Sequence, residues 1–129
     1  MMHLLYASRT GEFELSGRRS EFAMLADLLK TGSGEIVLEP VADPRPYDGA
    51  LERLVVRAAG ELLVSLRAEP VSGVLEFVGG AKYLALLGEN FESFAVESAG
   101  PGDNFHLEYY EGHFYLAADS VPLVVAMIG

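Results

Sequence analysis

The side chains best suited to chemistry gather in one short segment, residues 103–115. The segment reads Asp-Asn-Phe-His-Leu-Glu-Tyr-Tyr-Glu-Gly-His-Phe-Tyr. If Glu111 and Gly112 form a two-residue turn, the residues on either side pair as a β-hairpin. One face of that hairpin then carries His106, Glu108, Tyr110, His113 and Tyr115. The opposite face, which we expect to point into the core, carries Phe105, Leu107, Tyr109, Phe114 and Leu116.

Two kinds of chemistry suit the polar face. Histidine and carboxylate side chains on neighbouring strands can bind a transition metal. The spacing does not favour a metal, because His106 and His113 would lie at opposite ends of the hairpin with only Glu108 as a further ligand. Tyrosines beside His and Glu favour protein recognition, because tyrosine combines a rigid ring with a polar tip. A plain solvated sheet face is the alternative. The partner-binding surface that we predict consists of His106, Glu108, Tyr110, Glu111, His113 and Tyr115.

No recognisable catalytic or cofactor-binding motif accompanies this segment. The chain has no cysteine, and no Gly-x-Ser-x-Gly elbow that would activate a serine. The stretch at residues 31–34, Thr-Gly-Ser-Gly, follows a predicted helix, whereas phosphate-binding loops precede one, so we expect a helix C-cap there. We therefore predict a binding protein that is not an enzyme and needs no cofactor and no metal.

The charge of the chain is strongly acidic and unevenly distributed. The net charge is −10, with seven Lys/Arg against nine Asp/Glu in residues 1–60 and two against ten in residues 61–129. Nucleic acids and anionic membranes require clusters of basic residues, so neither is an expected partner. A basic protein is the better match, because opposite charge speeds encounter.

The composition predicts a single folded domain that spans residues 1–129. Half of the residues are hydrophobic and 22% are charged, which is typical of a globular protein and not of a disordered one. No apolar run approaches the roughly 20 residues that cross a bilayer. The absence of cysteine suits a reducing compartment, so we expect a soluble, cytoplasmic protein.

The sequence also resembles itself. Residues 11–17 align with residues 73–79 at an offset of 62, and residues 54–56 align with 123–125 at an offset of 69. The same offset of 69 places Leu38 opposite Leu107. These alignments predict an internal duplication, with one copy in residues 1–60 and the other in residues 61–129.

Each copy is predicted to contain two strands, a helix and two further strands. In the first copy, alternating and β-branched segments predict strands near 3–8, 12–16, 35–39 and 51–59, with an apolar helix face near 18–30. In the second copy, the strands are expected near 61–68, 74–78, 105–110 and 121–128, with a helix near 81–96 and a short strand at 113–117. Gly60 separates two strands tightly enough to predict a hairpin.

The predicted fold class is therefore α+β, made of two tandem ββαββ repeats. We expect an antiparallel sheet, or sheets, of about eight strands with both helices packed on one face. This order of elements resembles the duplicated units of sliding clamps and of the TATA-binding protein, which implies a clamp-like or saddle-like shape. It implies nothing about DNA binding, because the helices offer mainly acidic side chains outward, such as Glu21 and Glu89.

Near the end of the sequence, residues 106–117 read His-Leu-Glu-Tyr-Tyr-Glu-Gly-His-Phe-Tyr-Leu-Ala, and the pattern continues through Asp119-Ser120-Val121-Pro122-Leu123-Val124. This segment resembles a family of small bacterial immunity proteins from polymorphic toxin systems. Glu111 departs from the family pattern, which has Pro in this turn. The resemblance implies a cytoplasmic protein that neutralises a cognate toxin by covering or distorting its site.

Charge and resemblance together predict an acidic immunity protein that binds a basic toxin domain, such as a nuclease. The alternative is a clamp-like structural module that self-associates as a homo-oligomer. The apolar segment from Val121 to Ile128 could supply an edge strand for that association.

Overall fold

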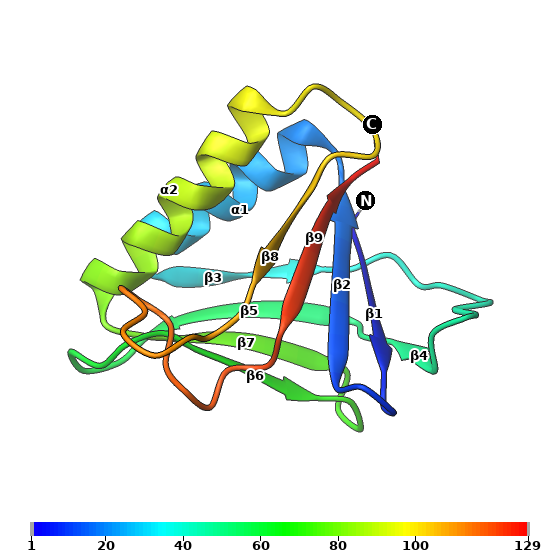
Figure 1. The fold of residues 1–129 in the computed structure, drawn as a ribbon, viewed down its shortest axis with the longest axis horizontal. Coiled ribbons are helices and arrows are strands. Elements are labelled where there is room, and N and C mark those ends of the chain that lie inside the picture. The colour runs from blue at the N-terminus through cyan, green and yellow to red at the C-terminus, as the bar shows by residue number, and fades with distance from the viewer. Residues whose placement is uncertain (1, 129) are drawn as a thin grey trace.

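The computed structural model describes residues 2–128, whose strands form two separate sheets. In Figure 1, the pair of helices lies above the four-stranded sheet and beside the five-stranded one. The elements in chain order are β1 (His3–Ala7), β2 (Glu12–Gly17), α1 (Arg19–Thr31), β3 (Ser33–Val37), β4 (Gly49–Ala50), β5 (Arg53–Ala58), β6 (Ser65–Glu69), β7 (Val74–Gly79), α2 (Ala81–Glu97), β8 (Asn104–Leu107) and β9 (Leu123–Met127). The α+β class predicted from the sequence is confirmed.

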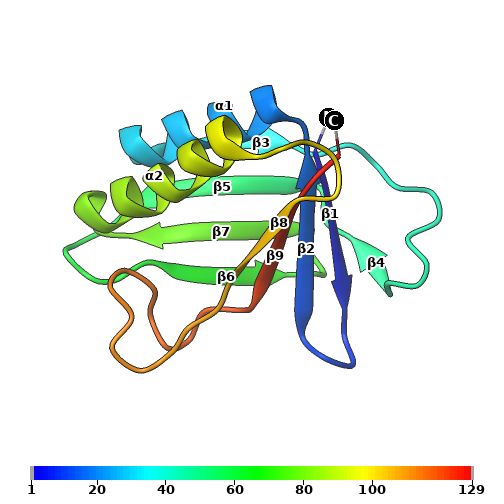
Figure 2. The same cartoon turned by 45° about the horizontal axis from the view of Figure 1, so that its top comes forward.

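Both sheets are mixed, whereas the sequence predicted antiparallel pairing throughout. The five-stranded sheet has the order β4-β1-β2-β9-β8, and the four-stranded sheet has the order β3-β5-β7-β6. The pairs β2·β9 and β5·β7 are parallel. Each parallel pair joins strands that are distant in the sequence, so no short turn dictates that they run in opposite directions. The strands of the two sheets cross steeply (Figure 2).

The hairpin predicted at Gly60 is wrong. β5 and β6 flank the turn at Gly60, but β7 lies between them in the sheet. Gly60 does adopt a positive φ of 61°, so the chain turns there as its residue type predicts. A turn residue sets only where the chain changes direction. Which strand pairs with β5 depends on packing, and both β5 and β7 bury side chains in the same core.

The C-terminal segment proposed as an edge strand is interior. β9 lies between β2 and β8 in the five-stranded sheet. Its Leu123, Val125 and Met127 side chains are buried in the core. Both edges of β9 are therefore occupied within the chain, so self-association through this segment is not available.

Strand pairing follows the offsets found in the sequence, with one difference. Leu4 pairs with Leu15 in β1·β2, and the residues 62 positions later, Leu66 and Phe77, pair in β6·β7. In the last strands, Leu54 pairs with Ile36 and Leu123 pairs with Leu107, so β3 and β8 correspond at an offset of 71 and not at the predicted 69. The duplication itself, the clamp-like shape and the repeat boundaries stay predictions.

Helix α1 begins and ends where its sequence predicts. The Glu21 carboxylate accepts the backbone N–H of Arg18 at 2.9 Å, which satisfies a donor that the first turn would leave unpaired. Gly32 ends the helix with φ 80° and donates its N–H to the Leu28 carbonyl at 2.9 Å. The Gly-rich stretch at residues 31–34 is thus a helix C-cap, as expected.

The core lies between the helix pair and the inner faces of both sheets. α1 and α2 lie side by side (Figure 1). Of the apolar faces that the periodicity predicts, the structure buries Phe22, Leu25 and Leu29 of α1 and Leu84, Leu87 and Phe91 of α2, whereas the predicted Leu28 and Phe94 are partly buried. Gly88 stands where the helices meet: a Cβ there would lie 3.0 Å from the Ala26 carbonyl oxygen. A residue that weakens an isolated helix is therefore used here for close helix packing.

Candidate functional site

The hairpin predicted around Glu111-Gly112 does not form, although its turn does. The His113 N–H donates to the Tyr110 carbonyl at 3.0 Å, and Gly112 has φ 83°. Beyond that turn, the chain hydrogen-bonds to Val64 and not to residues 105–110. The Val64 N–H donates to the Tyr115 carbonyl at 2.7 Å, and the Ala117 N–H donates to the Val64 carbonyl at 2.8 Å. The predicted strand at 113–117 is a single parallel bridge between Leu116 and Val64.

Because the hairpin is absent, its predicted faces are partly wrong. Tyr115, expected in solvent, is buried at 8% exposure, and Phe114, expected in the core, is 80% exposed. Tyr109 was also expected in the core and is exposed, whereas Leu107 and Leu116 are buried as predicted. The segment 108–122 is a loop that turns one aromatic ring inward and others outward.

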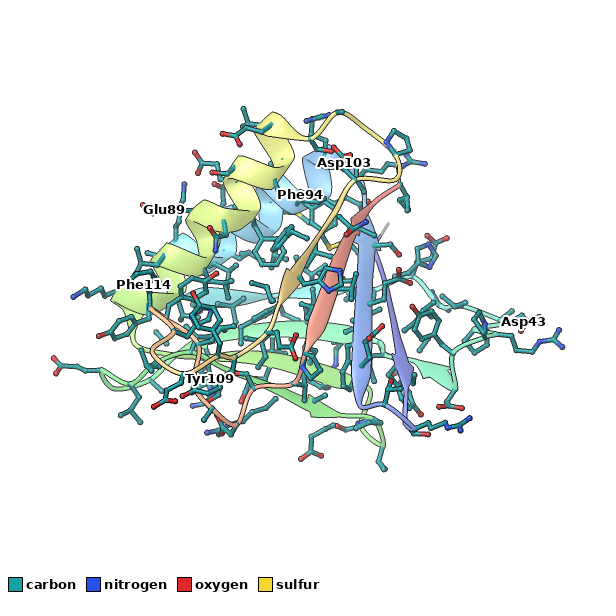
Figure 3. The ribbon with its side chains drawn as sticks, viewed as in Figure 1. Asp43, Glu89, Phe94, Asp103, Tyr109 and Phe114 are labelled. Atoms are coloured by element: carbon teal, nitrogen blue, oxygen red, sulfur yellow. The ribbon has the colours of Figure 1, made fainter. Side chains whose placement is uncertain are left out.

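Five of the six predicted partner-binding residues nevertheless meet in one place. A groove of about 450 Å³ lies between the C-terminal half of α2, strand β8 and the loop that follows β8. Its lining includes the predicted residues His106, Glu108, Tyr110, His113 and Tyr115. The sixth predicted residue, Glu111, is exposed at the tip of the turn. Figure 3 shows Phe94 of α2 and Asp103, which also line the groove, between α2 and the start of β8.

The floor of this groove is aromatic and continuous with the core. The Phe94 and Phe105 rings meet edge to face with centroids 4.8 Å apart, and Phe105 meets the fully buried Phe91 in the same way at 5.5 Å. Edge-to-face pairs of this kind add to the stabilisation from burial alone. Phe94 and Phe105 are only partly buried, so part of each ring faces the groove.

Carboxylates stand around this floor. Glu97 lies at the end of α2, Asp103 precedes β8, and Glu108 follows β8. The Asp103 carboxylate accepts the Ala99 N–H at 2.6 Å, and this bond ties the α2–β8 connection in place. Lys and Arg are absent from the groove lining, and the nearby Arg19 guanidinium donates to the Ser98 carbonyl at 2.8 Å. Three carboxylates against this one guanidinium leave the field of the groove negative.

Tyr115 joins the loop to helix α2. Its hydroxyl accepts a hydrogen bond from the Asn90 side-chain amide. Burial raises the pKa of Tyr115, partly offset by the Asn90 hydrogen bond, so the ring stays neutral and holds the loop against the helix. Asn90, Ser93 and Phe94 line the groove from α2 and were not predicted. The sequence offered no signal for them beyond a place on the helix surface.

His113 holds the turn together as a hydrogen-bond acceptor. Its Nδ1 accepts the backbone N–H groups of Tyr115 at 3.2 Å and Leu116 at 3.0 Å. Its ring lies between Tyr110 and Tyr115, with both centroid distances 4.6 Å. Burial lowers the pKa of His113. This histidine is therefore structural in its neutral form.

We expect acid to open the 110–116 turn through His113. A proton on Nδ1 would remove both accepted hydrogen bonds. Because the folded-state pKa is lowered, the stabilisation is present above the unfolded value of about 6.5 and is lost as the pH falls through the folded-state pKa. Hydrogen exchange of the Tyr115 and Leu116 amides, corrected for intrinsic rates, should accelerate below that range.

His113→Asn is the matched control, because Asn Oδ1 can accept at the Nδ1 position but does not titrate. The acid-induced acceleration should disappear in this variant. An unchanged pH dependence in His113→Asn would assign the opening to another group.

Within residues 2–128, no three His, Cys, Asp or Glu side chains gather closely enough to hold a metal ion. In the same part of the chain, no helix is long and apolar enough to span a bilayer.

Residues 74–127 match the family model described as Immunity protein 32. The match covers under half of the chain and includes every residue of the groove. The match supports an immunity protein family. Searches of curated proteins and of solved structures gave no significant match.

Proposed function

We propose that this chain is an immunity protein that binds and neutralises a cognate toxin whose contact surface is basic, and that it does so in the cytoplasm without catalysis. The observation that carries the proposal is the acidic groove with an aromatic floor. This groove lies within the residues that match the immunity family model. Residues 61–129, which contain it, hold two Lys/Arg against ten Asp/Glu.

Charge and exposed rings would play different parts in binding. Glu97 and Glu108 would speed encounter with a basic surface, since complementary fields raise association rates most strongly at low salt. Tyr110 and Phe114 are exposed on the loop beside the groove and would supply the apolar contact that slows dissociation. A toxin that holds nucleic acid needs a basic surface, which is the surface such a groove would cover.

The experiment compares two double charge reversals. Glu97→Lys with Glu108→Lys changes the groove, and Glu61→Lys with Glu69→Lys makes the same change in net charge at exposed positions outside the groove lining. The probe is the C-terminal domain of a toxin encoded beside this chain. At low salt, we expect the groove variant to associate at least about 10-fold more slowly, and the control to change by less than about 3-fold.

Growth of cells that express the toxin gives the second readout. The unaltered chain should restore growth, and the groove variant should restore it poorly. If both variants slowed association equally, the effect would come from net charge alone, and the groove would not be the contact surface. A chain that neither binds the toxin domain nor restores growth would reject the immunity function itself.

A further inference from the structure

Strand β8 leaves one edge of the five-stranded sheet open beside the groove. It pairs only with β9. The Met127 N–H donates to the Asp103 carbonyl at 2.8 Å, so Phe105 and Leu107, which follow at alternate positions, direct their backbone groups toward β9. The backbone N–H and C=O groups of Asn104 and His106 therefore point away from β9, toward open space.

The edge of β6 shows how this chain covers an edge elsewhere. There, the Val121 N–H donates to the Leu66 carbonyl at 2.9 Å, and the Leu66 N–H donates to the Ser120 hydroxyl at 3.1 Å. The segment that follows the groove loop thus occupies the open side of β6. Open edges invite pairing with another chain, and β8 carries no such cover.

The groove beside β8 has the chemistry of a site for an extended basic segment. Asn104 and His106, whose backbone groups are free, both line it. Carboxylates stand at its two ends, Glu97 by the start of β8 and Glu108 by its end. Its volume of about 450 Å³ falls within the usual range of about 300–1,000 Å³ for ligand sites.

We propose that the toxin inserts an extended segment into this groove and adds a strand to the sheet at β8. The segment would exchange backbone hydrogen bonds with Asn104 and His106. An apolar side chain would rest on Phe94 and Phe105, and Lys or Arg side chains on either side would reach Glu97 and Glu108. Backbone pairing supplies affinity and the alternating side chains supply specificity in this mode of recognition. This inference rests on the proposed immunity function.

The experiment separates the backbone of β8 from its side chains. His106→Pro removes the outward N–H and leaves the β8·β9 hydrogen bonds intact, because proline is tolerated at an edge position whose N–H faces away from the sheet. His106→Ala removes the side chain and keeps the N–H. With the same toxin domain as probe, we expect His106→Pro to bind at least about 10-fold more weakly than His106→Ala, because both variants lack the imidazole and only the proline lacks the outward N–H. Thermal unfolding of both variants checks that each is folded.

Hydrogen exchange on the unaltered chain tests the inference without a substitution. The Asn104 and His106 amides should exchange at least about 10-fold more slowly when the toxin domain is bound. Slower exchange at Ser33, Glu35 and Val37 of β3, without any change at β8, would overturn the inference in favour of the other sheet. Equal binding by His106→Pro and His106→Ala would overturn it as well.

The outcomes that contradict strand addition at β8 can be distinguished from those that contradict the proposed immunity function. If the chain neutralises the toxin and His106→Pro neutralises it equally well, the immunity function stands and strand addition is wrong. If the chain does not bind the toxin at all, the proposed function fails first. A peptide probe, acetyl-Lys-Val-Arg-Val-Lys-amide, adds a direct check: shifts of the Asn104 and His106 amides support the site, and shifts confined to Tyr109 and Phe114 contradict it.

Discussion

Phe91→Ala is expected to lower the free energy of unfolding by about 3–5 kcal/mol, the usual loss when a fully buried phenylalanine is truncated. Phe91 has no exposed surface, and its ring meets those of Phe22, Phe77 and Phe105 with centroids 5.5–6.4 Å apart. Its neighbours come from α1, β7 and β8, so no single element can close the cavity by moving alone. Denaturant unfolding measures the loss.

Phe114→Ala is the control for this substitution. The Phe114 ring is 80% exposed, so its truncation should change the free energy of unfolding by less than about 0.5 kcal/mol. The same variant should weaken binding to the toxin domain if Phe114 contacts the partner. Comparable losses of stability in the two variants would contradict the assignment of Phe91 to the core and Phe114 to the surface.

Gly79→Ala is expected to destabilise the fold by about 2–3 kcal/mol through overpacking. A Cβ at Gly79 would lie 2.7 Å from the Val64 Cα and 2.9 Å from the Leu63 carbonyl oxygen. Both are backbone atoms, which cannot relieve the clash by a change of rotamer. Val64 is the residue that hydrogen-bonds to Tyr115 and Ala117, so its displacement should also disturb the groove. Thermal unfolding and the amide shifts of residues 113–117 measure the two effects.

Gly17→Ala is the matched control, since Gly17 aligns with Gly79 at the offset of 62. There, a new Cβ would lie 2.9 Å from the Met2 Cγ, which belongs to a side chain, whereas the nearest atoms at Gly79 belong to the backbone. The loss at Gly17 should therefore be smaller than the loss at Gly79, because a methionine side chain repacks more readily than the backbone moves. If both variants lost the same stability, the effect would come from strand propensity and not from the close approach of Val64.

Local patterns in the sequence predicted the elements well. The apolar faces of both helices, the cap at Gly32 and most strands were found, because each depends on residues close in the chain. The two-residue β4 was not predicted, since Gly49-Ala50 has neither alternation nor β-branched side chains. What local patterns could not supply was the partner of each strand.

The sequence alone determined the residue types of the candidate site, its net negative charge and the turn at Gly112. Only the tertiary structure decided which of these residues face one another. The loop after β8 hydrogen-bonds to Val64, about fifty positions earlier, and not to the strand that precedes it. This choice buries Tyr115, exposes Phe114 and opens the groove beside α2. The physical reason is that every residue except proline offers the same backbone donor and acceptor, so the packing of the whole core selects which of them pair.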